Sequence, residues 1–223
     1  MGKAKVGIVV FPGSNCDHDA YFAFKEILKA DTKFIWHKEG SIGDRNLIIL
    51  PGGFSYGDYL RCGAIASFSS VMNDVVRFAK KGGVVIGICN GFQILCETNL
   101  LPGALLKNTN LQFICKTVSL TVENNKSIFT SNCSVKENIN IPIAHGEGCY
   151  YCDENVLTEL ISNNQIIFRY NENPNGSIYD IAGIQNLKRN VLGMMPHPER
   201  VSDEKLGNTD GLKILSSVVE SFD

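Results

Sequence analysis

Two features are missing from the sequence, and each absence excludes a class of protein. No apolar run is long enough to span a bilayer, and the apolar stretch at residues 6–11 is also too short for the core of a signal peptide. The formal net charge is −2 and Lys and Arg form no dense cluster, so no basic face is expected for a nucleic-acid backbone. We therefore predict a cytoplasmic protein with neither a membrane nor a nucleic-acid partner.

The usual frameworks for cysteine and for phosphate are also missing. The eight cysteines accompany no secretion signal, so we expect reduced thiols rather than disulfides. The C-x-x-C formed by Cys149 and Cys152 has no second pair to complete a zinc site, and we predict no bound metal. No G-x-x-x-x-G-K-[ST] loop is present, so we expect no cofactor in this chain and place any ATP site elsewhere.

Length and composition fit one ordinary globular domain. The 223 residues are 44% hydrophobic and 20% charged. A chain of this length buries most of its apolar surface without disulfides or structural metals. Neither a low-complexity linker nor an internal repeat divides it, so we predict a single domain over residues 1–223.

The order of apolar and amphipathic segments predicts an α/β fold. In the first half, apolar runs alternate with helical patterns, as in a parallel sheet covered by helices. In the second half, short runs that alternate polar and apolar residues predict antiparallel strands. The expected strands are residues 6–11, 34–37, 47–50, 84–88, 116–122, 139–144, 166–170, 181–185 and 191–195, and the expected helices are 17–29, 66–80, 91–97 and 209–221.

The sharpest local signal is G-I-C-N-G at residues 87–91, directly after the expected central strand. This is the thiol version of the strand-to-helix nucleophile elbow. Glycines are needed on both sides because a Cβ would strike the neighbouring backbone in so tight a turn. A lone cysteine is usually a small buried hydrophobe. Two flanking glycines after a buried strand instead favour Cys89 as a nucleophile held at a helix N-terminus.

The base expected to serve Cys89 is His197, in the segment M-M-P-H-P-E-R. It follows an apolar strand, so it should lie at the same edge of the sheet as Cys89. Pro198 favours an extended conformation at His197, and residues two apart on an extended chain project the same way. Glu199 would then orient the imidazole, as the third member of a catalytic triad does. Taken alone, the segment is more typical of a surface turn, and it is the elbow at Cys89 that favours the catalytic interpretation.

A glycine turn follows another apolar strand and completes the expected site. Residues 51–54 read P-G-G-F, and the glycines allow the backbone to approach a substrate closely. A tetrahedral intermediate needs backbone N–H donors directed at its oxyanion. We predict that the amides of Gly53 and Asn90 form this oxyanion hole, although a glycine turn without such a role fits the same residues.

These motifs together resemble the class I, triad-type glutamine amidotransferases. Longer stretches narrow the resemblance to the free-standing glutaminase subunits of phosphoribosylformylglycinamidine synthases. These stretches are F-P-G-S-N-C-D at 11–17, G-G-F-S-Y-G-D-Y-L-R at 52–61, A-H-G-E-G at 144–148 and G-M-M-P-H-P-E-R at 193–200. The resemblance runs from Val6 to the final helix. It departs at Cys149, where a polar residue is expected.

The resemblance implies a fold, a reaction and partners. The fold would be flavodoxin-like, with a mostly parallel central sheet flanked by helices and antiparallel additions in the second half. Gly52, Phe54 and Gln93 would bind glutamine, which the triad would hydrolyse to glutamate and ammonia. A large synthetase subunit, holding ATP and Mg, would use the ammonia to convert formylglycinamide ribonucleotide to its amidine in purine biosynthesis. A small accessory subunit is implied as a further partner.

Five polar residues lie in two loops that are expected near the active site. Tyr56, Asp58 and Arg61 follow the glycine turn, and His145 and Glu147 belong to the H-G-E-G motif. We interpret them as the rim of the active site or the partner interface, because loops at this end of a sheet meet substrates and partners. A solvated loop is the alternative for the first three residues. A core or loop-bracing histidine is the alternative for His145.

Two other functions, and a second cysteine as nucleophile, are the alternatives to this interpretation. Other elbow-cysteine thiol hydrolases usually place a histidine directly after the cysteine, where this chain has Asn90. A non-catalytic regulatory module would be expected to have lost its nucleophile or its base. Cys16 lies near an expected helix start but has only His18 as a nearby candidate base, so we interpret it as structural.

Overall fold

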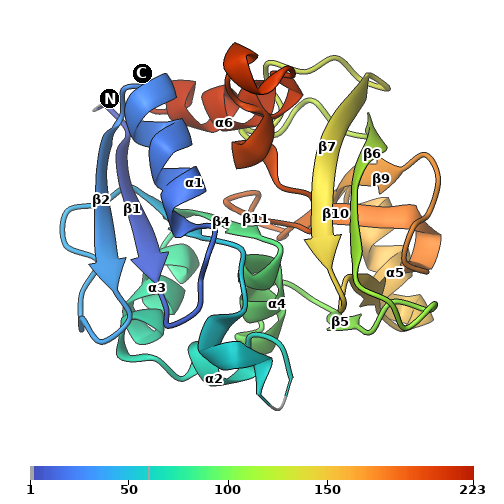
Figure 1. Cartoon of the computed structure of the whole chain (residues 1–223), viewed down its shortest axis with the longest axis horizontal. Coiled ribbons are helices and arrows are strands. Elements are labelled where there is room, and N and C mark those ends of the chain that lie inside the picture. Colours follow the sequence, from blue (N-terminus) through green and yellow to red (C-terminus); the bar gives the residue numbers. More distant parts are fainter. Residues whose placement is uncertain (1–2, 60) are drawn as a thin grey trace.

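A nine-stranded sheet runs through the molecule in the order β2-β1-β3-β4-β11-β10-β9-β6-β7. The computed structural model describes residues 3–59 and 61–223, so Leu60 of the 52–61 stretch lies outside the described residues. Figure 1 shows the blue-to-green first half on one side and the yellow-to-orange antiparallel strands on the other. The two halves therefore occupy successive parts of one continuous sheet.

Five strands form the parallel half of the sheet. They are β1 (Lys5–Val10), β2 (Asp31–Trp36), β3 (Leu47–Leu50), β4 (Val84–Ile88) and β11 (Val191–Met194). The last strand of the chain lies parallel to β4, with Met194 opposite Ile88. The carboxyl ends of these strands meet at one edge, where ligands bind in sheets of this kind.

The remaining strands are antiparallel. They are β6 (Ile114–Val122), β7 (Asn138–His145), β9 (Ile166–Tyr170) and β10 (Ile181–Gln185), with a separate pair formed by β5 (Ala104–Leu106) and β8 (Cys149–Tyr151). Burial alternates along much of β7, as expected for a strand with one solvated face. By contrast, every residue of β3 is buried, because helices cover both faces of the parallel half.

Helices cover the sheet and connect its strands. They are α1 (Asp17–Phe22), which continues as a π-helical turn (Ala23–Ile27), α2 (Ala64–Ser67), α3 (Ser70–Lys80), α4 (Asn90–Glu97), α5 (Glu154–Ser162) and α6 (Asp210–Glu220). Helix α4 packs on β3, β4 and β11, directly below the expected nucleophile. Helix α6 packs on β7 and on the turn that follows His197.

The structure differs from the sequence-based expectation in several elements. Strand β2 begins at Asp31 instead of residue 34, and the helix expected at 17–29 becomes π-helical from Ala23. The helix expected at residues 66–80 is two helices, because Ser69 is extended with φ −63° and ψ 147°. Helix α5 and the β5–β8 pair were not predicted. Helix α5 fully buries only Leu160, with Val156 and Leu157 packed partly buried beside it. Asp153 caps the helix by accepting the Val156 amide at 2.9 Å.

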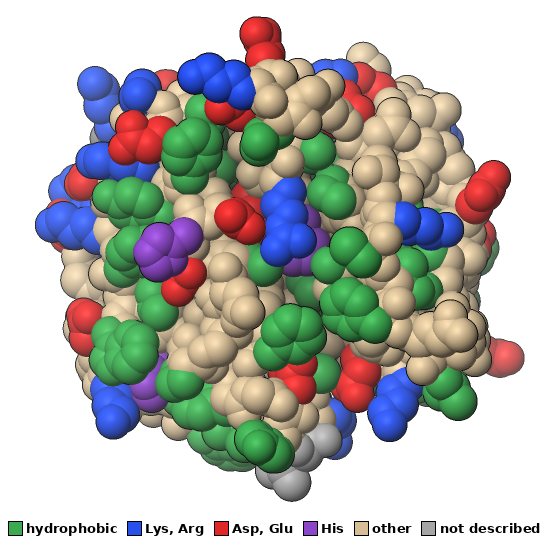
Figure 2. Space-filling view, in the orientation of Figure 1, with side chains coloured by type: hydrophobic (Ala, Val, Ile, Leu, Met, Phe, Trp, Pro, Cys, Tyr) green, Lys and Arg blue, Asp and Glu red, His purple; other side chains and the backbone are tan. Residues whose placement is uncertain are grey.

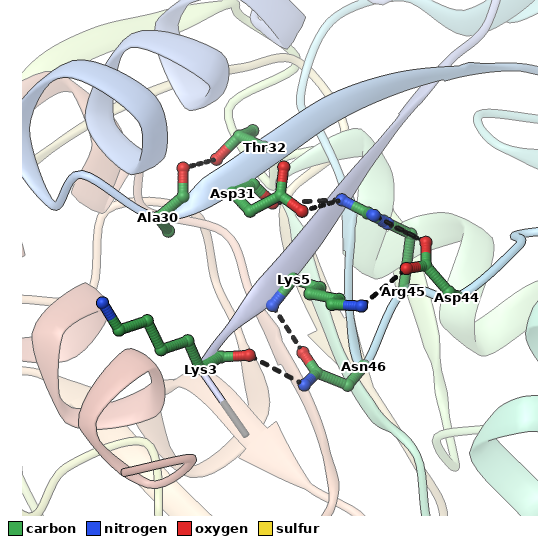
Figure 3. A network of polar contacts seen from close by, with 8 residues as sticks. All are labelled: Lys3, Lys5, Ala30, Asp31, Thr32, Asp44, Arg45 and Asn46. Atoms are coloured by element: carbon green, nitrogen blue, oxygen red, sulfur yellow. Dashed lines mark hydrogen bonds and ion pairs between the residues drawn. The ribbon is translucent and has the colours of Figure 1, made fainter.

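The edge of the sheet farthest from the expected site holds a buried arginine. Figure 3 shows Arg45 between Asp31 and Asp44, whose carboxylates lie 3.1 and 2.6 Å from its guanidinium. The Arg45 side chain is only 4% exposed, whereas the two carboxylates are about half exposed. This network joins the amino-terminal ends of β1, β2 and β3, because Asn46 also bonds to the Lys5 amide.

The surface mixes charges of both signs. On the face seen in Figure 2, acidic and basic side chains alternate with scattered apolar ones and with broad uncharged areas. Within residues 3–59 and 61–223, no helix combines the length and the apolar character that crossing a membrane would require.

Candidate active site

Cys89 occupies a strained elbow between β4 and α4. Its backbone has φ 50° and ψ −105°, and its amide donates to the Met194 carbonyl of β11 at 2.8 Å. A Cβ on Gly87 would lie 2.5 Å from the Gly91 carbonyl oxygen, and a Cβ on Gly91 would overlap the Leu50 carbonyl of β3. Both glycines are therefore required by close backbone packing, and the elbow holds Cys89 as the first residue before a helix.

His197 and Glu199 form a buried pair at the same edge. Nδ1 of His197 lies 2.7 Å from Oε1 of Glu199, and the two side chains are 1% and 0% exposed. The His197 amide donates to the Pro142 carbonyl of β7 at 2.8 Å, which fixes the backbone. Glu199 reaches the ring from a 3₁₀ turn at Pro198–Val201, so the extended geometry that we expected from Pro198 does not continue to Glu199.

The imidazole of His197 lies against the nucleophile. A Cβ placed on Gly52 would be 2.6 Å from Cε1 of His197 and 3.3 Å from Cβ of Cys89, so Gly52 leaves the space in which they meet. Burial alone lowers the pKa of His197, but the Glu199 carboxylate and the sulfur atoms of Cys89 and Cys16 raise it well above its usual value. Nε2 has no hydrogen-bond partner among the described residues. It is therefore available to a reacting group.

The glycine turn brings two backbone amides to the site. Gly53 has φ +126°, and a side chain there would overlap the Asn15 amide, so only glycine fits. Within the described part of the chain, the amides of Gly53 and Asn90 donate to no backbone carbonyl outside the helices and strands. Phe54 next to them is 45% exposed, with its ring centroid 6.2 Å from that of Phe113. The turn, through Gly53, and the elbow, through Asn90, thus each offer one free N–H donor, with Phe54 as an apolar neighbour of the first.

Asn90 and Gln93 join three segments around the elbow. The Asn90 side chain accepts the Ser55 amide at 3.3 Å and donates to Oε1 of Gln93 at 2.8 Å. Nε2 of Gln93 donates to the Glu147 carbonyl at 2.7 Å. Gln93 therefore uses both ends of its amide within the protein, where it holds the loop after β7 against α4.

The loop after the glycine turn is tied into the fold. The Tyr56 hydroxyl lies 2.5 Å from Nδ1 of His37 and 3.0 Å from Oγ of Ser69. Burial raises the pKa of the Asp58 carboxyl, which accepts from Asn90 at 3.3 Å. Asp58 therefore lies close to the elbow.

Arg61 lies farther out, where it forms a two-point ion pair with Glu97 at 2.7 and 2.6 Å. The Arg61 side chain is 65% exposed. Of the three polar residues in this loop, it is thus the one that faces solvent.

The H-G-E-G loop contains a buried, neutral histidine. Nδ1 of His145 lies 3.1 Å from Oδ1 of Asn108, and Asn175 lies at its other ring nitrogen. Burial and the nearby charge of His197 lower the pKa of His145 to about 4. These contacts match the loop-bracing interpretation of His145. Glu147, two residues on, contacts Gln93 through its backbone carbonyl.

Cys16 is a site residue that the sequence did not indicate. Its nearest base is not His18, whose side chain is 82% exposed and turned to Asp17, but His197. Arg200 contributes a donor 3.2 Å from the Cys16 sulfur. Because His197 and Arg200 are more than 180 positions away in the chain, only the fold reveals this contact.

All eight cysteines are free, Cys149 and Cys152 among them. Of the described His, Cys, Asp and Glu side chains, one group is compact enough to surround an ion: Cys16, His197 and Glu199, with atoms within 4.8 Å of one another. A Glu199 oxygen already bonds to the His197 ring and is therefore not free to bind an ion together with it. We interpret the group as a proton-transfer arrangement.

Comparisons with known proteins match this geometry. A model of the CobB/CobQ-like glutamine amidotransferase domain matches residues 3–211. The chain is 43% identical to a chain in the structure of PurLQS from Thermotoga maritima, over 100% of both, with a TM-score of 0.91. These findings confirm the resemblance proposed from the motifs.

More distant structures share the fold alone. A glutamine amidotransferase from Thermotoga maritima is 13% identical over 98% of this chain and 91% of its own, with a TM-score of 0.61. The glutaminase domain of Trypanosoma brucei CTPS, with bound acivicin, is 12% identical over 99% and 95%, with a TM-score of 0.62. They confirm the predicted α/β fold with its antiparallel second half.

Proposed function

The chain belongs to the CobB/CobQ-like glutamine amidotransferase family, and from this premise we propose that it is the glutaminase subunit of a phosphoribosylformylglycinamidine synthase. Its identity of 43% with a PurLQS chain extends over the full length of both proteins. The observation that carries the chemical part is the placement of Cys89 against His197, whose Nδ1 is held by Glu199 at 2.7 Å. A nucleophile, a base and an orienting carboxylate thus stand in one buried site.

The proposed reaction begins with the thiolate of Cys89. It attacks the side-chain amide carbon of glutamine, and the oxyanion that develops accepts N–H bonds from Gly53 and Asn90. His197 gives its proton to the departing ammonia, which leaves a glutamyl thioester on Cys89. The same imidazole then takes a proton from water, and attack of that water releases glutamate. Glu199 keeps the ring in the tautomer and orientation that both steps need.

Gly52, Phe54 and Gln93 are the proposed walls of the glutamine pocket. Gly52 supports this because any side chain there would fill the space between Cys89 and His197. Gln93 would act by holding the Glu147 loop, since both ends of its amide are already bonded. Phe54 would offer its half-exposed ring to the methylene groups of the substrate.

The ammonia would be used by a large synthetase subunit, with a small accessory subunit as a further partner. The PurLQS assembly that contains the 43% identical chain supports this arrangement. ATP and Mg would be held by the synthetase, because this chain has no phosphate-binding loop of the P-loop type. Arg61, whose side chain is 65% exposed, is a candidate for the contact surface.

Labelling with a diazo-ketone analogue of glutamine tests the proposal. The analogue requires a glutamine-shaped pocket and an activated thiolate, and peptide mass spectrometry identifies the modified residue. We expect an adduct on Cys89 that is lost in His197→Ala. An adduct on another cysteine would contradict the assignment. Absence of any adduct, both alone and with the synthetase present, would contradict the glutaminase itself.

A further inference from the structure

Cys16 lies against the catalytic imidazole although the proposed reaction gives it no role. It is 3% exposed, and its amide donates to the Gly52 carbonyl at 3.3 Å. A Cβ on Gly52 would be 3.3 Å from the Cys16 sulfur and 2.6 Å from Cε1 of His197, so sulfur and ring flank the same point. The sulfur, a ring nitrogen and a Glu199 oxygen lie within 4.8 Å of one another.

Arg200 fixes the sulfur in this position. Its Nη2 donates to the sulfur at 3.2 Å, and its Nε donates to Oδ2 of Asp19 in α1 at 3.2 Å. Since the sulfur accepts a guanidinium N–H, it acts as an acceptor and presents electron density to its other neighbours. One of these is the imidazole, of which a ring nitrogen lies within 4.8 Å of the sulfur and whose buried Nε2 has no hydrogen-bond partner among the described residues.

We propose that Cys16 is a positioning residue for His197, and that its sulfur, held by Arg200, stabilises the imidazolium form of the ring. The inference rests on the glutaminase function proposed above. Cys89 gives up its negative charge when it becomes the glutamyl thioester, and at that stage His197 must take a proton from the attacking water and become the imidazolium again. Glu199 and Cys16 are then the acceptors that remain beside the imidazolium.

Other charged groups around the ring do not replace this role. His145 of β7 is a like-charge neighbour, and burial keeps it neutral. Arg200 is a cation, but its charge is shared between Asp19 and the sulfur. Asp210 of α6, which packs on the same turn, bonds to the Asn140 amide at 2.8 Å. The pKa of His197, lowered by burial but raised by Glu199, Cys89 and Cys16, agrees with this account.

NMR titration of His197 in a Cys89→Ala background tests the proposal. This background has no sulfur at position 89, so it imitates the thioester stage, at which Cys89 carries no negative charge. The chain has four histidines, so a His197→Gln variant identifies the Cε1–H signal. Adding Cys16→Ala should lower the His197 titration midpoint by about one pH unit. Adding Cys16→Asp instead, which places a carboxylate acceptor beside Arg200, should raise it again. Cys133→Ala removes another buried thiol and serves as the matched control, with no shift expected.

An unchanged midpoint in the Cys16→Ala variant would overturn the proposal. If that variant does not fold, Cys16→Val, which keeps the bulk of the side chain but has no acceptor, takes its place, and a midpoint equal to that of the parent again overturns it. In the otherwise unaltered chain with its synthetase, the base limb of the glutaminase pH profile should move down by the same amount. These outcomes are separate from a failure of the proposed function, which would appear as absent Cys89 labelling in the unaltered protein.

Discussion

Nδ1 of His197 lies 2.7 Å from a carboxylate oxygen of Glu199, and both side chains are almost fully buried. The two residues are two apart in sequence, so one short turn carries both the base and its orienting group. A buried carboxylate this close to an imidazole fixes which ring nitrogen carries the proton. It also stabilises the ring once it is charged.

Glu199→Gln should therefore reduce glutaminase kcat by about a hundredfold or more. The amide removes the negative charge that raises the pKa of His197, so that pKa falls. The base limb of the pH profile should move to lower pH, because the imidazolium that protonates ammonia is lost earlier. Assays of glutamate release against pH, with the synthetase present, measure both effects. Glu159→Gln, on the exposed face of α5, is the control and should leave the profile unchanged. A base limb that does not move in Glu199→Gln would contradict the role of Glu199 in charging His197.

Gly52→Ala should inactivate the protein without unfolding it. The added methyl would lie 2.6 Å from Cε1 of His197 and 3.3 Å from Cβ of Cys89, so it separates base from nucleophile. A displacement of about 1 Å in such a site costs on the order of a hundredfold in rate. Labelling of Cys89 by the glutamine analogue measures this loss, and thermal unfolding checks the fold. Gly40→Ala, where no atom lies within 4 Å of the new methyl, should label normally.

The Arg45 network predicts that removing the buried arginine and removing its two carboxylates lower the free energy of unfolding by different amounts. Arg45→Met removes the buried charge and leaves two carboxylates that are already about half exposed, so we expect a cost of about 1 kcal/mol. The double change Asp31→Asn and Asp44→Asn leaves the guanidinium buried without an anion, and should cost more than Arg45→Met. Urea unfolding measures both free energies. Equal losses of stability would contradict the difference between the two sides of the pair. As a control, Glu26→Gln, in an exposed pair with Lys29, should cost less than about 0.5 kcal/mol.

Local signals in the sequence predicted the elbow and most strands correctly. The run before Cys89 is apolar throughout and lies between parallel neighbours, and glycine positions mark the tight turn around it. The same holds for β3, which ends where Pro51 and the glycines begin. Such features depend on neighbours within a few residues, so one sequence is enough to identify them.

Features that depend on distant residues were missed or reached for the wrong reason. Cys16 meets His197 only because β11, the last strand of the chain, returns beside β4 in the sheet. Glu199 was expected beside His197 on an extended chain, but it arrives from a 3₁₀ turn instead. The role of Gln93 in the substrate pocket stays a prediction, but its contact with the Glu147 carbonyl lies on a loop that the elbow motif does not contain.

His145 should make the protein less stable below neutral pH. Burial and the charge of His197 lower its pKa from 6.5 to about 4 in the folded chain. Between these values the unfolded chain binds the proton and the folded chain does not, so stability rises with pH across this range. The contribution is fully present above about pH 6.5 and is lost as pH falls toward 4, to a total of at most about 3 kcal/mol.

His145→Gln should remove this dependence while keeping an amide that can bond to Asn108 and Asn175. Urea unfolding at pH 7.5 and pH 5 gives the free energy of each protein. The difference between the unaltered chain and the variant should shrink, or change sign, at the lower pH. His18→Gln, at a side chain that is 82% exposed, should leave the pH dependence as it was. A difference that is the same at both pH values would mean that His145 titrates normally, and that Asn108 and Asn175 brace the loop without help from a buried neutral ring.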